Sequence, residues 1–373
     1  MKSRGHLPAA FSLAVLSVFC ACAHDDRPLE ARLTEAITDG LQAHNVKGAS
    51  VAVVLPDDSL RCYVCGLSHD SVRVSPEMLV AIGSITKNVV ASLVFQLAEE
   101  GLLSLDDSLG RWLPPYPKVD GSITIRQLLA HTSGLYMFWE NQQLWDDLIA
   151  YRDSAFAPET VLAYLGDPYF APGKGFKYSN TNYLLLAMIV TRATHSTLSA
   201  EMRGRFWDVL GLENTYLSME EEIPPQLLHV WGDNFEKGSP IRDITYLPRT
   251  SHETITYGSS GIFTTPGELA RWAHALFGGK VLKGPSLAVM MDIDGDDYGL
   301  GVHTFRKSLT GGRRAVGHGG GNIGMMTYMV HWPDLRVSLV VTINAFNGDC
   351  LNQITEDVAD ILLDHVARAG GAG

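Results

Sequence analysis

The 373-residue chain has little basic charge, and this shortage excludes one broad class of function. Lys and Arg number 29 against 41 Asp and Glu, which gives a formal net charge of −12 at pH 7. A nucleic-acid-binding protein needs a concentrated basic surface, so we expect no nucleic-acid partner. Internal repeats and low-complexity tracts are also absent, which argues against repeat and collagen-like classes. Hydrophobic residues make up 46% of the chain, enough to bury a large core.

Long apolar runs are missing after the first residues. A short apolar stretch at 7–19 follows Lys2 and Arg4. This stretch is too short to span a bilayer and is typical of a signal peptide. We therefore predict that residues 1–22 are a signal peptide and that the protein is exported, to the periplasm or outside the cell. A lipid attached to Cys22 would be its one contact with a membrane.

Cysteine is scarce, and its spacing does not fit a metal site. Cys62 and Cys65 form a CxxC pair, but a zinc site would need a second pair, so we predict no metal and no cofactor. A thioredoxin-like motif would open a helix, whereas residues 60–67 are typical of a strand. We interpret Cys62, Cys65 and Cys350 as buried or paired structural cysteines.

Hydrophobic periodicity predicts strands near both ends of the chain and helices between them. The expected strands are 49–55, 60–67, 325–332 and 337–343, and the expected outer helices begin at Leu29 and end near Val366. This order predicts an α+β fold with an antiparallel sheet flanked by the terminal helices. One domain over 23–373 would contain a sheet part, about 29–83 and 257–370, and an inserted mainly helical part, about 84–256.

A serine and a lysine three positions apart are the first candidates for chemistry. Ser84 and Lys87 fall at the start of a predicted helix, where positions i and i+3 share a face. A serine hydroxyl needs a nearby base to become a nucleophile, and the positive helix N-terminus favours a neutral amine. Ser84 is therefore a candidate nucleophile and Lys87 a candidate proton acceptor. Alternatively, Ser84 caps the helix and Lys87 lies in solvent.

Tyr178 and Asn180 form a second candidate pair, just before an apolar run at 183–190. In a turn, two such side chains can point together, so that the phenol relays a proton and the amide binds a substrate carbonyl. The alternative is that Ser179 or Asn180 caps the following helix while Tyr178 packs in the core.

A glycine-rich segment at 317–324 precedes the strand predicted at 325–332. Glycine lets the backbone approach a ligand closely, and an edge strand here could offer an N–H group to an oxyanion. His318 could act in acid–base chemistry or bind a carboxylate. A dinucleotide site is excluded because a strand, not a helix, follows. A lipase-type site is excluded because the chain contains no GxSxG sequence.

Together and in this order, the three motifs resemble those of a known family. Ser84-Ile-Thr-Lys87, Tyr178-Ser-Asn180 and His318-Gly-Gly320 are similar to the Ser-x-x-Lys, Tyr-x-Asn and Lys/His-x-Gly motifs of the serine β-lactamase and D-alanyl-D-alanine carboxypeptidase superfamily. The resemblance is to the branch of class C β-lactamases, the Streptomyces-type DD-carboxypeptidase and related esterases. It covers residues 30–366 approximately and implies the penicillin-recognising serine hydrolase fold.

The resemblance also implies a role for each motif residue. These roles are the acylated nucleophile for Ser84, shared proton transfer for Lys87 and Tyr178, substrate amide binding for Asn180, and an oxyanion hole from the N–H groups of Ser84 and of Gly321, which follows Gly320. His318 stands where β-lactamases of this branch carry lysine, and histidine is only partly charged at neutral pH. That departure favours a peptidase or esterase over efficient β-lactam hydrolysis.

These features predict an exported serine hydrolase that acts through a Ser84 acyl-enzyme on a D-alanyl-D-alanine-type peptide or a related small amide or ester. The alternatives are a β-lactamase, a small-ester esterase and a catalytically silent module that binds cell-wall peptides. Pure binding would not require a nucleophile beside a base. We expect a monomer with a small-molecule or short-peptide substrate.

Three other features are interpreted mainly as structural. His131 is expected to serve as a packing and turn element, and residues 292–297 as an acidic turn, because a calcium loop would need a distal Glu. The aromatic residues after His131 could line a substrate cleft or belong to the helical core, and both interpretations stay open; they are Tyr136, Phe138, Trp139 and Trp145.

Overall fold

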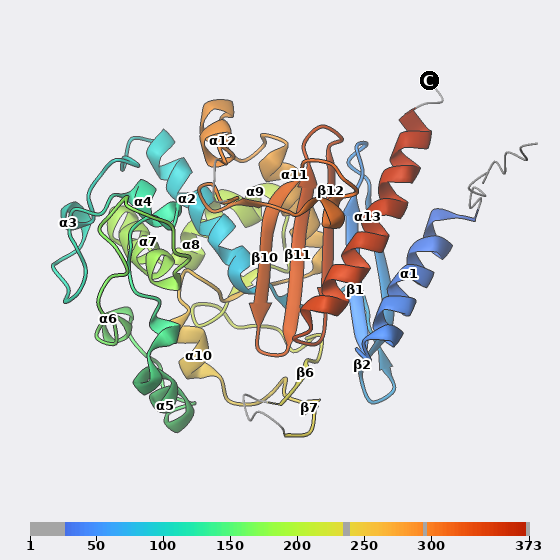
Figure 1. Ribbon diagram of the computed structural model, residues 1–373, viewed down its shortest axis with the longest axis horizontal. Helices are drawn as coiled ribbons and strands as arrows, with labels where there is room; N and C mark the ends of the chain where they lie inside the picture. Colours follow the sequence, from blue (N-terminus) through green and yellow to red (C-terminus); the bar gives the residue numbers. More distant parts are fainter. Residues whose placement is uncertain (1–26, 234–238, 294–296, 371–373) are drawn as a thin grey trace, which may run out of the picture.

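The computed structural model describes residues 27–233, 239–293 and 297–370, so the expected signal peptide, Cys22 and part of the acidic turn lie outside it. Its centre is an antiparallel sheet of seven strands in the order β3-β2-β1-β12-β11-β10-β9 (Figure 1). The strands are β1 (Gly48–Val54), β2 (Leu60–His69), β3 (Val72–Arg73), β9 (His303–Thr304), β10 (Val316–Asn322), β11 (Met325–Trp332) and β12 (Val337–Ile343). The predicted α+β class, with a sheet assembled from both ends of the chain, is confirmed.

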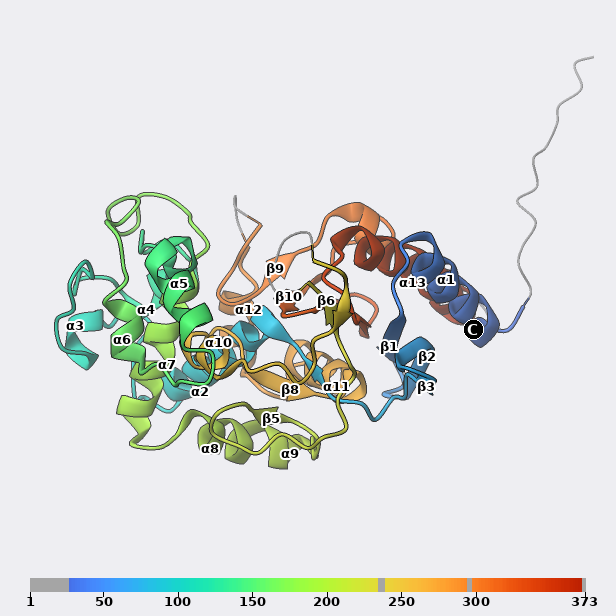
Figure 2. The ribbon, with the colours of Figure 1, turned by 90° about the horizontal axis from the view of Figure 1, so that it is seen from below.

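Helices cover both faces of this sheet (Figure 2). The terminal helices α1 (Leu29–Ala43) and α13 (Gly348–Gly370) pack on one face, and α11 (Pro266–Phe277) packs on the other. Successive side chains alternate between the faces, so Val51 lies under the terminal helices and Ala52 belongs to the core on the α11 side. Helices cover the side chains on both faces of the sheet, so every residue of β1 is buried.

The terminal helices run antiparallel. Arg32 near the start of α1 pairs with Asp364 near the end of α13 at 3.1 Å. At the other end of the pair, the Cys350 thiol of α13 donates to the Gly40 carbonyl of α1 at 3.7 Å. The beginning of α1 therefore lies beside the end of α13.

The CxxC pair is divided between the two faces of the sheet. An odd separation along a strand puts Cys62 and Cys65 on opposite faces, so that Cys62 packs on the α11 side and Cys65 under the terminal helices. Both thiols, and that of Cys350, are free. The paired interpretation is therefore wrong, and the buried one holds for Cys65 and Cys350, whereas Cys62 is only partly buried.

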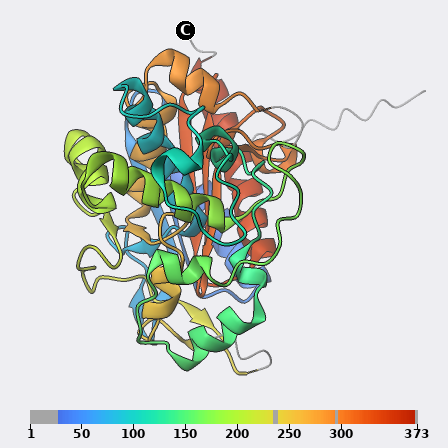
Figure 3. The same ribbon diagram turned by 90° about the vertical axis from the view of Figure 1, so that its left-hand side faces the viewer.

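The inserted part is mainly helical and stands beside the sheet (Figure 3). Its two long helices are α2 (Thr86–Glu99) and α7 (Asn180–Thr194). The shorter helices are α3 (Leu109–Trp112), α4 (Ile125–Leu129), α5 (Gln142–Ala150), α6 (Pro158–Leu162), α8 (Leu198–Met202), α9 (Asp208–Leu210), α10 (Thr250–Ile255) and, beyond the inserted part, α12 (Gly284–Met290). Of the described helices, none combines the length and the apolar character needed to cross a bilayer.

Short strands that the sequence did not predict complete this region. They are β4 (Val80–Ala81), β5 (Tyr216–Leu217), β6 (Trp231–Gly232), β7 (Arg242–Asp243) and β8 (Ile262–Thr264). Strands of two or three residues are too short to show an alternating pattern, which explains why periodicity missed them.

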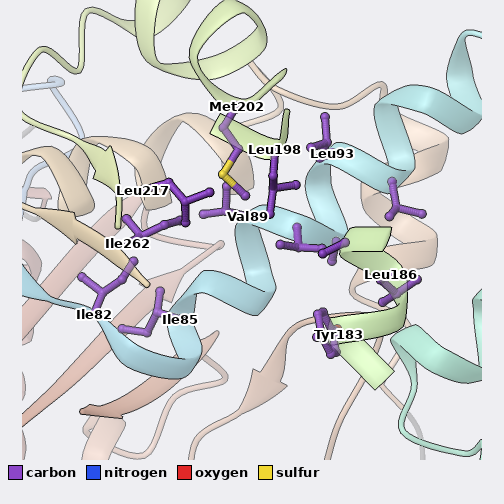
Figure 4. Close-up of a cluster of buried hydrophobic side chains, with 14 of the residues drawn as sticks. Ile82, Ile85, Val89, Leu93, Tyr183, Leu186, Leu198, Met202, Leu217 and Ile262 are labelled. Atoms are coloured by element: carbon purple, nitrogen blue, oxygen red, sulfur yellow. The ribbon is translucent and has the colours of Figure 1, made fainter. Parts of the chain in front are cut away.

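The start of α2 is fixed by the core (Figure 4). Ile82 and Ile85, on either side of the Gly83–Ser84 step, point into the same buried cluster as Val89 and Leu93 of α2. A helix that is apolar on all sides belongs in a protein interior, and α2 is buried over most of its length. The packing of these apolar side chains therefore fixes Ser84 and Lys87 at the start of α2.

Candidate active site

Ser84 and Lys87 meet at the start of α2. Ser84 lies in a 3-10 turn, η1 (Gly83–Ile85), and the Lys87 Nζ is 2.9 Å from the Ser84 Oγ and 2.9 Å from the Ser259 carbonyl oxygen. The Lys87 side chain is 0% exposed. Neither η1 nor α2 has a side-chain cap. The alternative in which Ser84 caps a helix and Lys87 lies in solvent is therefore wrong.

Burial sets the protonation of both groups next to the Ser84 hydroxyl. It lowers the pKa of Lys87 well below its ordinary value, because desolvation disfavours the ammonium form. It also raises the pKa of Tyr178, against a smaller lowering by a hydrogen bond with Ser84. The lowered pKa favours the neutral amine and the raised pKa the protonated phenol, and both groups lie beside the Ser84 hydroxyl. The amine is the base that this geometry supplies.

The turn that carries Tyr178 and Asn180 is held by His131. The Nδ1 atom of His131 accepts a hydrogen bond from the Ser179 N–H at 3.2 Å and lies 2.9 Å from Nδ2 of Asn182. The imidazole ring packs 4.2 Å from the Tyr178 ring, measured between centroids. His131 is therefore the packing element that we expected, and it also fixes the orientation of Tyr178.

Helix capping does not explain the Tyr178–Asn180 sequence. Ser179 stands at the N-cap of α7 but its side chain makes no capping hydrogen bond. Its hydroxyl donates instead to the Tyr136 carbonyl at 3.2 Å. Asn180 is the first residue of α7, and it lines the cavity next to Ser84. The capping alternative is wrong.

The glycine-rich segment is strand β10, which packs directly against η1. A Cβ atom on Gly320 would overlap the Ile82 carbonyl oxygen and come within 3.1 Å of the Ser84 nitrogen. Only glycine permits this approach. The Gly319 N–H donates to His303 Nε2 at 3.0 Å, away from β11, and strand alternation points the Gly321 N–H the same way. The Gly321 N–H therefore points away from β11.

His318 is a neutral imidazole in this site. Its Nδ1 donates to the Gly319 carbonyl at 2.6 Å, which leaves Nε2 to accept from the Tyr298 hydroxyl at 3.1 Å. Burial lowers its pKa well below the ordinary value, and the neighbouring His303 and Lys87 lower it further. An uncharged His318 cannot supply the fixed cation that a substrate carboxylate would need.

A cavity of about 700 Å³ opens beside Ser84. Its polar wall includes Ser84, Asn180 and Gly321, and the rest is largely apolar and aromatic, with Trp139, Trp145, Trp231, Ile323 and Phe346. The two interpretations of the aromatic segment are both partly right. Trp139 and Trp145 line the cavity, whereas Phe138 is buried in the core and Tyr136 stacks on Tyr169.

Three of the seven candidate residues, Ser84, Asn180 and Gly321, line this cavity. The other four are buried behind Ser84 or along β10; they are Lys87, Tyr178, His318 and Gly320. The sequence analysis missed several of their neighbours. Tyr298 and His303 contact the glycine-rich strand, and Asn322 extends it along the cavity wall. Asn322 directly follows the glycine run and could have been proposed from its position. Tyr298 and His303 carry no local signal. Within the described ranges, no group of His, Cys, Asp and Glu side chains could hold a metal ion.

Comparisons with known proteins place this geometry in a family. The Beta-lactamase family model matches residues 33–362. The chain is 29% identical to penicillin-binding protein 4* of Bacillus subtilis over 71% of its own length, and 26% identical to a D-aminopeptidase of Brucella anthropi over 82%. It spans only 60% and 58% of those two relatives.

Solved structures show the same fold. A D-stereospecific amidohydrolase from Streptomyces sp. is 25% identical with a TM-score of 0.75, covering 87% of this chain and 97% of that one. A D-amino acid amidase from Ochrobactrum anthropi SV3, complexed with D-phenylalanine, is 23% identical with a TM-score of 0.79, covering 91% and 99%. Because the family model spans most of the sequence, the predicted resemblance is confirmed, and the chain belongs to the Beta-lactamase family.

Proposed function

We propose that this serine hydrolase uses Ser84 to form an acyl-enzyme with small amides, peptides or esters of D-amino acids. The observation that carries the proposal is the 2.9 Å contact between the Ser84 hydroxyl and the amine of a fully buried Lys87. A buried amine with a lowered pKa is free to take the hydroxyl proton, which activates the serine as a nucleophile.

The reaction follows from the positions of the protons. The Lys87 amine takes the Ser84 proton as Oγ bonds the substrate carbonyl carbon, and the N–H groups of Ser84 and Gly321 receive the oxyanion. Tyr178 then protonates the leaving nitrogen or oxygen as its bond to carbon breaks, and the Lys87 ammonium returns a proton to the phenol. Water repeats the sequence in place of serine and releases the acid product.

The site has a leaving-group end and an acyl end. The leaving group takes its proton from Tyr178, whose ring lies 6.5 Å from His318 at one end of the glycine run in β10. The acyl part therefore extends towards the other end of that run, where the aromatic walls of the cavity lie, including Trp139, Trp231 and Phe346. These walls favour a bulky apolar acyl group.

The charges of the site favour amides and esters over substrates with a terminal carboxylate. His318 is neutral, and the described residues that line the cavity include neither lysine nor arginine. A D-alanyl-D-alanine-type peptide would find no counter-ion for its carboxylate. The relatives described as a D-aminopeptidase, a D-amino acid amidase and a D-stereospecific amidohydrolase support D-amino-acid amides as the substrate class.

An intact-mass time course with D-phenylalanine p-nitroanilide, its L enantiomer and benzylpenicillin tests the proposal. We expect turnover of the D substrate at least about 10-fold faster than the L substrate, a rate ratio that corresponds to about 1.4 kcal/mol. The mass of one acyl group should be trapped on the wild type but not on Ser84→Ala. Ser92→Ala is the matched control, because Ser92 is a buried serine of α2 whose hydroxyl donates to the Asn88 carbonyl.

Unchanged turnover by Ser84→Ala would contradict the acyl-enzyme, and preference for the L substrate would contradict the D-amino-acid class. Rapid consumption of penicillin with only a fleeting adduct would establish a β-lactamase instead. A lasting penicilloyl adduct would point to a DD-peptidase.

We also propose that the protein is exported and acts as a monomer. Export is supported by the basic residues and apolar stretch that begin the sequence. N-terminal sequencing of the protein from fractionated cells would find a start near residue 23 if this is right. Light scattering would measure the mass of the particle in solution.

A further inference from the structure

The cavity beside Ser84 extends well beyond the reacting atoms. Its lining passes from Gly321, near the end of β10, to Phe346, which follows β12, and on to Val46, which precedes β1. β6 and β7 lie along the same edge of the sheet (Figure 1), and β6 contributes Trp231 to the lining. The cavity is therefore elongated and crosses the ends of several strands.

The sheet sets the length of this cavity. The strand order β1-β12-β11-β10 puts three strand spacings between Gly321 and Val46. The strands share one edge there, because Met326 of β11 and Ala49 of β1 both pair with Ile343 of β12. Neighbouring strands lie about 4.8 Å apart, so the cavity spans about 14 Å. An extended peptide rises about 3.3 Å per residue, and this length therefore corresponds to about four residues.

Two of the most exposed large apolar side chains in the described part of the chain line this cavity. Phe346 is 68% exposed and Ile241 is 66% exposed. The Phe346 ring lies close to Gly321, because a Cβ atom added to that glycine would be 2.8 Å from the ring Cε2 atom. Exposed apolar side chains that gather beside a reactive group mark a surface that a ligand covers.

The same cavity has polar atoms that need partners. Oδ1 of Asn180 and Oγ of Ser260 are buried, belong to lining residues and make no hydrogen bond among the described residues. Both oxygens can accept from an N–H group. Asn45 and Asn347 add polar side chains at the far end. A peptide offers N–H and C=O groups along its length, whereas an alkyl chain would leave the buried oxygens unpaired.

We propose that the acyl part of the substrate is an extended peptide of about four residues, which runs from Ser84 across the ends of β11 and β12 to the segment before β1. This inference rests on the function proposed above, and it narrows that function from amides of single amino acids to oligopeptides and their amides or esters. A substrate with one residue would fill only the end next to Ser84 and would leave most of the apolar wall in water.

The test measures kcat/KM for acetyl-D-phenylalanine p-nitroanilide and for the same compound with one to five D-alanine residues inserted after the acetyl group. Acetylation gives every member of the series the same charge. We expect kcat/KM to rise by about 2- to 10-fold for each added residue, the range of one neutral hydrogen bond, and to stop rising after about the third addition. A kcat/KM that stays flat or falls along the series would overturn the proposal.

Ile241→Ser and Phe346→Ser should each weaken the rise with peptide length, because they remove apolar contacts with the added residues. Both side chains are exposed, so the fold should not depend on them. Val209→Ser is the matched control, since Val209 is a β-branched side chain that is 70% exposed and is not among the residues that line the cavity. An equal loss for the shortest and the longest substrate in both variants would refute the proposal, as would the same weakening in the control.

Two further measurements separate this inference from the proposed function. A burst of p-nitrophenol from p-nitrophenyl acetate that Ser84→Ala abolishes reports the acyl-enzyme without any long acyl group. Such a burst together with a flat peptide series would refute the long site alone, whereas the absence of both burst and hydrolysis would refute the proposed function as well. A rate that rises from p-nitrophenyl butyrate to decanoate, but not along the peptide series, would replace the peptide with an alkyl chain.

Discussion

At the scale of single residues, the site works with groups that burial keeps uncharged. Lys87 owes its low pKa to desolvation, and His318 and Tyr178 are neutral for the same principal reason. A neutral amine beside a serine is a base that is ready before substrate arrives. Folding therefore supplies part of the free energy needed to deprotonate the ammonium ion at neutral pH.

Lys87→Met should separate this base from the fold. Methionine has a similar length and no charge, so the buried position is kept while the proton acceptor is lost. General-base catalysis contributes about 100- to 10,000-fold, and we expect acylation of Ser84 to slow by that factor. Stopped-flow release of p-nitroaniline measures it, and the melting temperature should stay unchanged or rise. Acylation within a factor of ten of the wild type would assign the base to another group.

The pH dependence of acylation should have the sign set by Lys87. The ammonium form is inactive, so kcat/KM rises with pH through the Lys87 pKa, which burial places below the ordinary value. His318, with its pKa well below its ordinary value, should add no step between pH 6 and 8. A pH series on the wild type and on His318→Gln checks this. A histidine step that disappears in the variant would show that His318 titrates.

At the scale of elements, the sequence predicted best where a strand is long and buried on both faces. Residues 325–332 and 337–343 were predicted with the same ends as β11 and β12, because apolar runs bounded by a Pro333-Asp334 turn leave little choice. β10 is different, since glycine is a poor strand former. Its conformation depends on Ile82 and Ser84, which lie more than two hundred residues earlier in the sequence.

The same distinction applies to the site. Ser84 with Lys87, and Tyr178 with Asn180, were recognisable because each pair is local and its spacing carries the chemistry. Tyr298 and His303 were not, because their positions depend on packing between distant segments. Motif residues can therefore be predicted from one sequence, whereas the residues that tune them need the tertiary structure.

The contact between β10 and η1 should tolerate a methyl group at one glycine and not at its neighbour. In Gly320→Ala the new Cβ meets the Ile82 backbone, which cannot move without displacing Ser84. In Gly319→Ala it meets the Tyr328 ring at 3.0 Å, and a side chain can adjust. Losing the alignment of one oxyanion donor costs about 100- to 1,000-fold in rate. We expect that loss for Gly320→Ala and less than about 10-fold for Gly319→Ala.

Equal losses in the two variants would show that the strand tolerates no side chain on either face. Little loss in Gly320→Ala would show that the Gly321 N–H is not an oxyanion donor. Steady-state rates together with melting temperatures separate these outcomes from simple unfolding.

At the scale of the whole molecule, buried histidines should make the fold sensitive to mild acid. Burial lowers the pKa of His331 to about 3, and His131, His303 and His318 shift in the same direction. The unfolded chain binds protons near pH 6.5 and the folded chain does not, so stability is complete above pH 6.5 and falls as the pH decreases. Each such histidine contributes a slope of about 1.4 kcal/mol per pH unit.

Urea unfolding between pH 7 and pH 4.5 measures that slope. His331→Asn is the informative variant, because asparagine can keep the contact with the Ser338 hydroxyl, 2.8 Å from His331 Nδ1, without titrating. In this variant the slope should decrease by at most about 1.4 kcal/mol per pH unit, which is the contribution of the one proton that His331 binds in the unfolded chain. A wild-type free energy of unfolding that does not change over this range would contradict burial of neutral histidines.

The antiparallel pairing of α1 and α13 also has a consequence for engineering. The two ends of the described chain meet, while His44 to Val46, just beyond the far end of α1, lie at the wall of the cavity. A short peptide could join the ends, and the gene could be reopened at an exposed turn such as 278–280 to give a circular permutant. Attaching the protein to a support at the joined ends would leave the mouth of the cavity facing the solution.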